Sequence, residues 1–344
     1  MSTSLNLSWR ASMRRLRGWR RGPAPLRRAR IAGADLEAVS GAYWLVRAFY
    51  LIVLHFAFET QRHLHSLGAS DRQIDPLWPV FWVDQANFAA AANVIGIGFL
   101  ASAIAAIVWP DRRAPKLMVA LFYMQALAFE NSFGSINHYG HFGLWLSLCF
   151  AALPPVSQDR LRGSRLDRRR FLSVVFLAQS LLALFYTSSG ARKAYYGLFV
   201  PDGAVSSFAP DALPLLVVQK WLQTGDQPLL ADLFLQHLWL AWPAHLLVIY
   251  VELFALVAVF RPELHRIWGA MLITFHLMVW MLLGITFAYQ PALLALMFVW
   301  SPFAPRPHPR PAEVLRQLPA LGDLARLVLP PAQRAKDLNA GWSK

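Results

Sequence analysis

The chain has 344 residues, of which 56% are hydrophobic and 15% are charged, and its formal net charge is +14. A soluble globular protein carries about 25% charged residues, so this composition argues against a soluble domain. The apolar residues form long runs separated by short charged stretches, a pattern typical of a polytopic membrane protein. Nucleic-acid binding is not indicated, because most basic residues flank apolar runs, where lipid head groups and topology account for them.

Residues 1–40 form an Arg-rich arm. No apolar segment follows the basic residues within these 40 positions, so the arm does not resemble an ordinary secretory signal. We expect it to be a cytoplasmic arm that lies solvated at the membrane surface. The single cysteine, Cys149, lies within an apolar run. This excludes an intrachain disulfide and argues against a thiolate metal site.

Eight apolar segments are predicted to be spanning helices, since a span needs ~20 mostly apolar residues and fewer when it packs against neighbours. The third and fourth are the short ones. Residues 41–303 are therefore predicted to form one all-α, polytopic membrane bundle. In chain order the segments are Tyr43–Phe58, Phe88–Trp109, Lys116–Phe129, Phe142–Leu153, Phe171–Ser188, Phe234–Phe260, Trp268–Leu283 and Thr286–Phe303.

The distribution of Lys and Arg predicts the orientation of these segments. The links after the second, fourth and sixth segments are basic, and so are the N-terminal arm and the Pro- and Arg-rich tail, 304–344. The loop Glu130–His141 contains no Lys or Arg. Because basic residues concentrate on the cytoplasmic side, both termini are predicted to be cytoplasmic, most simply in a bacterial inner membrane. An amphipathic stretch in the tail, Ala312–Leu329, is predicted to lie on the inner leaflet.

A long outer loop, 189–235, begins with Arg192 and Lys193, on the side where positive charge is rare. A topological stop therefore explains this pair poorly, whereas head-group contact or pairing with Asp202 stays open. Leu213–Leu222 is predicted to be an interfacial helix within the loop, which would then form a lid or a substrate surface.

Among the ionisable residues within predicted spans, three stand out, namely Arg47, Glu252 and His276. Such residues are costly in the membrane and face the protein interior with a partner. Glu252 and Arg47 could pair with each other, and the commoner role of a lone buried histidine such as His276 is a hydrogen bond to a carbonyl group.

Two histidines of the outer loop, His138 and His141, are spaced so that they could share a metal ion. No third ligand stands at the expected spacing, so no metal is expected. Lys193 has a different capacity. Desolvation at an apolar boundary and the like charge of Arg192 both favour its free amine, so the sequence permits Lys193 to act as a general base.

The region Gly41–Phe303 resembles the membrane domain of the vitamin K-dependent gamma-glutamyl carboxylases, also called the horizontally transferred transmembrane (HTTM) domain. The order and spacing of five motifs carry the resemblance. They are WLVRAF (Trp44–Phe49), INHYGHFGLWLSL (Ile136–Leu148), FYTSSGARK (Phe185–Lys193), YVELF (Tyr250–Phe254) and FHLMVWMLLGITFAYQPALLALMFVWSPF (Phe275–Phe303).

The resemblance implies a lyase that uses a reduced, vitamin K-like quinone in a dry cavity facing the extracytoplasmic side. Lys193 would be the catalytic base that deprotonates the quinol, and His138 would aid the carboxylation step. The implied cofactor-binding residues are Asn137, His141, Arg192, Glu252 and His276. The implied partners are membrane lipids and either a peptide or protein substrate or partner membrane subunits.

Two other functions stay open, because the family's double lysine is Arg192–Lys193 here. The chain could be a non-catalytic membrane subunit or a lipid- or quinone-binding scaffold of a larger complex. A scaffold predicts a cavity filled by side chains or by an acyl chain, with Lys193 paired to a carboxylate. A transporter is the third alternative, although the sequence shows no evident internal repeat.

Overall fold

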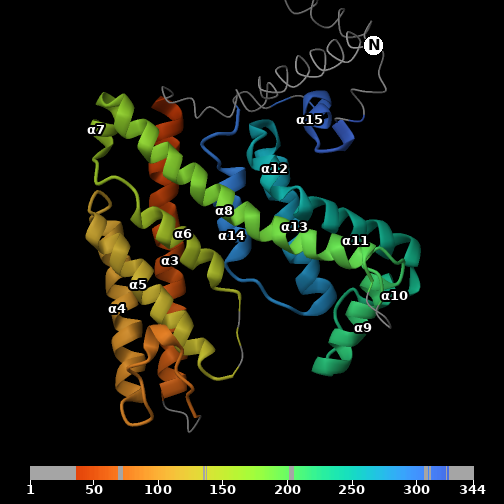
Figure 1. The fold of residues 1–344 in the computed structure, drawn as a ribbon, viewed down its shortest axis with the longest axis horizontal. Helices are drawn as coiled ribbons and strands as arrows, with labels where there is room; N and C mark the ends of the chain where they lie inside the picture. Colours follow the sequence, from red (N-terminus) through yellow and green to blue (C-terminus); the bar gives the residue numbers. More distant parts are fainter. Residues whose placement is uncertain are drawn as a thin grey trace, which may run out of the picture.

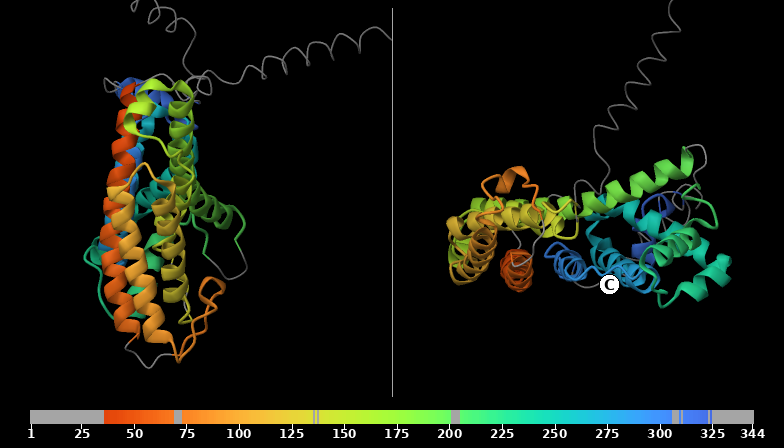
Figure 2. Two further views of the ribbon diagram at one scale, coloured as in Figure 1. Left: turned by 90° about the vertical axis from the view of Figure 1, so that its left-hand side faces the viewer. Right: turned by 90° about the horizontal axis from the view of Figure 1, so that it is seen from below.

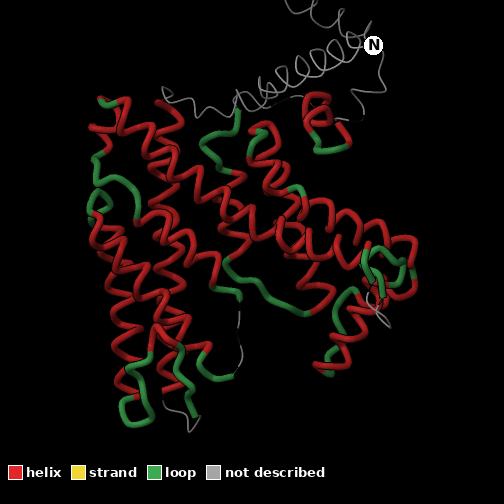
Figure 3. The backbone as a smooth tube through the Cα atoms, in the orientation of Figure 1, coloured by secondary structure: helices red, strands yellow, loops and turns green. Residues whose placement is uncertain are grey.

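The computed structural model describes residues 36–68, 73–134, 136, 138–200, 205–305, 309, 311–322 and 324. Over these residues the chain is all-α, with helices joined by loops and no strand (Figure 3). The predicted fold class is confirmed to this extent. Residues 1–35 of the N-terminal arm, most of the tail, Asn137 and Asp202 lie outside the described residues, whereas residues 36–40 of the arm belong to the first described helix.

Within the described part of the chain, four helical segments are long and apolar enough to cross a membrane, not eight as predicted. Leu36–Leu67 lies in α3 (Leu36–Gly68), and Phe88–Val108 is α4. Arg165–Leu198 is α8, and Pro262–Leu283 combines the short turn η2 (Pro262–Leu264) with α13 (His265–Leu283). By length and composition, these four segments are able to cross a membrane.

The other four predicted spans are helical, but each is too short or too polar for that class. Helix α5 (Arg113–Asn131) carries charged residues at both ends, and α6 (His141–Ala151) has 11 residues. The sixth segment is divided into α11 (Leu238–Leu253) and α12 (Ala255–Val259). The eighth consists of α14 (Gln290–Leu294) and the π-helical turn η3 (Ala295–Val299). The count of eight was wrong because apolar composition alone does not show where a helix breaks.

Two groups of helices lie next to each other, and α8 extends along both (Figures 1 and 2). The first contains α3, α4, α5 and α6, which pack in chain order. The second contains α9 (Ala212–Thr224), α10 (Ala231–Gln236), α11, α12 and α13. The turn η3 contacts both α3 and α13 and so joins the groups. Short elements at the periphery are η1 (Trp78–Val80), α7 (Gln158–Gly163) and α15 (Pro311–Gln317).

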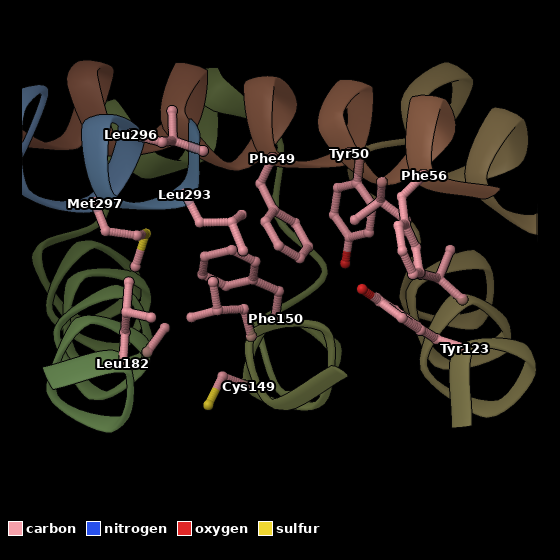
Figure 4. Packing of buried hydrophobic residues seen from close by; sticks show 14 of the residues in the cluster. Phe49, Tyr50, Phe56, Tyr123, Cys149, Phe150, Leu182, Leu293, Leu296 and Met297 are labelled. Carbon is pink, nitrogen blue, oxygen red and sulfur yellow. The ribbon is translucent and has the colours of Figure 1, made fainter. Parts of the chain in front are cut away.

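The core of the first group is built from aromatic side chains (Figure 4). Phe49 of α3 meets Phe150 of α6 edge to face, with ring centroids 4.8 Å apart. Tyr50 of α3 and Tyr123 of α5 are both buried, and their hydroxyl groups point toward each other in Figure 4. Such edge-to-face pairs add to area burial, so this group forms a rigid wall beside α8.

The predicted interfacial helix Leu213–Leu222 lies within α9, which ends at Gly225 in a left-handed conformation with φ 76°. Glycine adopts this conformation without steric cost. Helix α9 packs against α11 and α13. The long loop therefore forms a helical cover over the second group.

Candidate functional site

The motif FYTSSGARK lies in the half of α8 that packs against α11 and α12. Because α8 continues to Leu198, Arg192 and Lys193 lie within a helix and not in a loop as predicted. Thr187 Oγ1 accepts a hydrogen bond of 2.9 Å from the backbone N–H of Leu256, just after the break between α11 and α12 at Phe254. A helix start leaves backbone N–H groups without intrahelical partners. Thr187 satisfies one of them and fixes the break against α8.

Gly190 brings the backbones of α8 and α11 into direct contact. A Cβ atom at Gly190 would lie 2.3 Å from the Leu253 nitrogen and 2.6 Å from its Cα atom. Only glycine fits such an approach, because these neighbours are backbone atoms that cannot turn aside. The contact places Glu252 directly beside the next residues of α8.

Lys193 and Glu252 form an ion pair between the Lys193 Nζ atom and Glu252 Oε2. Ser189 Oγ donates a hydrogen bond of 3.3 Å to the other carboxylate oxygen. The side chain of Glu252 is 3% exposed, whereas that of Lys193 is 30% exposed. Both carboxylate oxygens of Glu252 thus have partners, and Lys193 is the more exposed member of the pair.

Arg47 is not the partner of Glu252, so that sequence-based interpretation was wrong. Its guanidinium carbon lies 5.2 Å from the ring centroid of Tyr43 and 5.3 Å from that of Trp44. A guanidinium group over aromatic faces makes cation–π contacts. Arg47 therefore belongs to α3 and not to the site.

A cavity of about 570 Å³ lies beside Lys193, and we name it the Lys193 cavity. One wall is a stripe along α13 from Ile267 to Leu283, which is about 24 Å long at 1.5 Å per residue. Its side chains are apolar apart from Lys193, His245 and Thr274. The shape suits a molecule with an apolar chain and a polar head. The lining residues are Lys193, Leu213, Leu216, Phe234, Ala244, His245, Leu247, Val248, Val251, Ile267, Ala270, Met271, Thr274, Phe275, Met278, Val279, Leu282, Leu283 and Phe287.

Sequence reasoning missed His245 of α11, which lines this cavity and is 6% exposed. It lies near enough to Lys193 for the two side chains to interact electrostatically, and its ring lies near the backbone of Ser207. The available signal was its position seven residues before Glu252 in an apolar run. That spacing places both on one face of a helix.

His276 lies on α13 but not among the residues that line the Lys193 cavity. Its Nε2 atom is 2.6 Å from the hydroxyl oxygen of Tyr186 on α8, so its partner is a tyrosine and not a carbonyl group. The Phe287 ring packs against it at 4.7 Å between centroids. His276 thus ties α13 to α8 behind the cavity.

His138 and His141 also lie outside the cavity lining, so the expectation that Lys193 and His138 line one cavity was wrong. His138 is exposed, and its ring centroid lies 5.1 Å from that of His141. Arg192 is exposed, with its guanidinium carbon 5.7 Å from the Tyr196 ring centroid. Among the residues described, no group of three or more His, Cys, Asp or Glu side chains could hold a metal ion.

A second polar cluster lies in the first group, where α5 ends. The Tyr139 hydroxyl donates a 2.7 Å hydrogen bond to Glu130 Oε2, and Gln290 Nε2 donates a 2.6 Å bond to the Tyr139 carbonyl. Burial raises the pKa of Glu130 to about 7, and the bond from Tyr139 partly offsets this. The cluster ties the loop before α6 to α5 and α14.

We expect Glu130 to make stability fall as pH rises from about 4.5 to about 7. Over this range the folded protein retains a proton that the unfolded chain has lost, so rising pH favours unfolding. The loss is on the order of 3 kcal/mol at 1.4 kcal/mol per unit. Unfolding temperatures of the detergent-solubilised protein at pH 5 and pH 8 measure it. The isosteric Glu130→Gln variant should show a much weaker pH dependence, and an unchanged dependence would contradict the assignment.

Comparisons of the chain with family models, curated proteins and solved structures return no match. The resemblance to the gamma-carboxylases therefore stays a prediction that rests on the motifs. Over the described residues, the fold and the site define an all-α protein with four helical segments long and apolar enough to cross a membrane and with an apolar, lysine-bearing cavity.

Proposed function

We propose that the protein is a membrane-embedded enzyme, similar to the vitamin K-dependent gamma-carboxylases, that acts on a lipid-soluble quinol in the Lys193 cavity. The single observation that carries the proposal is the Lys193–Glu252 ion pair at the wall of an elongated apolar cavity. An apolar cavity with few convergent polar groups is the usual form of a site for a small molecule. A quinol fits this chemistry, since it combines an acidic hydroxyl head with an apolar chain.

The ion pair supports a specific role for Lys193. Beside the buried Glu252 carboxylate, the amine is an ammonium group with three donors, and it can stabilise the oxyanion that forms when a quinol hydroxyl loses its proton. The surrounding apolar wall strengthens this attraction, because charges interact more strongly where water is excluded. Glu252 holds the ammonium group in place, and the hydrogen bond from Ser189 holds Glu252.

The cavity is proposed to open toward the extracytoplasmic side of a bacterial inner membrane, with both termini cytoplasmic. The Arg-rich link before α8 supports this orientation, because it marks the opposite end of the helix from Lys193. Lipids and a peptide or protein substrate would then be the partners.

A non-catalytic lipid- or quinone-binding scaffold is the second candidate. Two observations favour it, namely the pairing of Lys193 with a carboxylate and the position of His138 outside the cavity. Side chains do not fill this cavity, whose volume is about 570 Å³, so in a scaffold it would hold an acyl chain or a quinone. The two candidates differ in turnover and not in binding.

The proposal is tested by adding a reduced long-chain quinone and a glutamate-containing peptide to purified protein. We expect quinol consumption coupled to carbon dioxide fixation, and both should be lost in Ala270→Trp, which fills the cavity from α13. Leu277→Trp is the matched control, because Leu277 lies on the same helix outside the cavity lining and is 50% exposed. Quinone binding that is blocked only by Ala270→Trp, without consumption, would favour the scaffold. No binding at all would overturn both.

A further inference from the structure

We infer, building on the proposed function, that His245 and not Lys193 accepts the proton of the ligand's hydroxyl group in the Lys193 cavity. Nothing in the sequence motifs pointed to this residue. The inference rests on a comparison of two basic side chains that line the cavity. Lys193 has a carboxylate partner, whereas His245 has none among the described residues.

The Lys193 amine is engaged by Glu252, which is almost completely buried. Removing the proton from this ammonium group would leave the carboxylate buried without its counter-ion, which is unfavourable. His245 has no carboxylate partner within the part of the chain that the structure describes. It is therefore the basic side chain of the cavity that is free to take up a proton.

The His245 ring lies beside the Ser207 backbone and lines the cavity. A neutral imidazole has one N–H donor and one nitrogen that can accept a hydrogen bond. His245 lines the cavity, so that nitrogen can meet a hydroxyl group there. The position of the ring makes it a candidate general base next to the ammonium group.

Two hydrogen bonds fix the segment beside His245. Trp242 Nε1 of α11 donates a 2.9 Å hydrogen bond to the carbonyl of Phe208, and Ser206 Oγ donates a 2.9 Å bond to the carbonyl of Gly197. The segment is thus attached to both α11 and α8, and it forms a fixed boundary beside the His245 ring.

The proposed step transfers one proton. The ligand's O–H bond breaks, its electron pair stays on the oxygen, and a new N–H bond forms on His245. The products are an oxyanion and an imidazolium ion, and the oxyanion pairs with the Lys193 ammonium group. Charge is conserved, and no oxidant, reductant or metal is needed for this step.

The test uses a 4-nitrophenol with a dodecyl chain, because its phenolate form absorbs visible light and its phenol form does not. The probe is bound to the purified full chain at a pH about one unit below the probe's own pKa, where the free probe is mostly protonated. We expect the wild-type protein to convert most of the bound probe to phenolate. This readout needs no turnover, so it separates failure of the inference from failure of the proposed enzyme.

His245→Gln is the decisive variant, since glutamine is polar and can accept a hydrogen bond from a ligand but cannot take up a proton. We expect it to bind the probe within about threefold of the wild-type affinity while forming little phenolate. If the quinol is also consumed, its kcat should fall by about 10²–10⁴ with little change in KM. His237→Ala is the matched control, because His237 is an exposed histidine at the start of α11.

Phenolate formation in His245→Gln equal to that of the wild type would overturn the inference, and so would a wild-type protein that binds the probe only as the phenol. A probe that does not bind the wild-type protein would overturn the inference together with the proposed ligand class. Normal phenolate formation without quinol turnover would support the inference and contradict only the proposed reaction.

Discussion

Replacing Lys193 with methionine is expected to destabilise the protein by about 3 kcal/mol, because it leaves the Glu252 carboxylate buried without its counter-ion. Ser189 alone would then bond the carboxylate. The change should also lower any quinol turnover by about 10²–10³, the effect of removing one donor from a developing oxyanion. Equilibrium unfolding in mixed micelles measures the first effect, and the quinol assay measures the second.

The double variant Lys193→Met with Glu252→Leu separates the two effects. Replacing both members of a buried ion pair by apolar groups is often neutral, so most of the lost stability should return while activity stays low. A double variant as unstable as the single one would show that the pair does not couple these helices. Recovered activity would remove Lys193 from the chemistry.

Replacing Gly190 with alanine is expected to be among the most damaging single changes, costing more than about 3 kcal/mol. The added Cβ atom would stand 2.3 Å from the Leu253 nitrogen, so α11 would have to move away from α8. Such a movement would also separate Glu252 from Lys193. The amount of folded protein in membranes and its unfolding temperature are the measurements.

Gly41→Ala is the matched control, because Gly41 is also helical and an added Cβ would meet only Pro302 Cβ at an ordinary 3.6 Å. Removing a helical glycine with space around it should be neutral or stabilise the protein by about 0.5–1 kcal/mol. Equal tolerance of alanine at both positions would contradict the close approach of α8 and α11.

The candidate site shows how far sequence reasoning reaches. It identified Lys193 and Glu252 as polar residues that needed an explanation in an apolar setting, but it considered Arg47 as the partner of Glu252 and grouped His138 with Lys193. The structure pairs Glu252 with Lys193 and leaves both Arg47 and His138 elsewhere. The rotation of a helix about its axis is set by packing, and an apolar run facing lipid and protein alike carries little information about it.

By itself, the sequence determined the all-α class and the approximate positions of the apolar helices, because composition and chain order are local properties. It placed Lys193 in a loop after a helix, whereas α8 continues past this residue to Leu198. It did not determine that the sixth apolar run breaks at Phe254, or that His245 faces the cavity while His276 bonds Tyr186 behind it. Only the tertiary structure decided these points. They depend on the crossing of α8 and α11 at Gly190, where two backbones touch and fix which side chains meet.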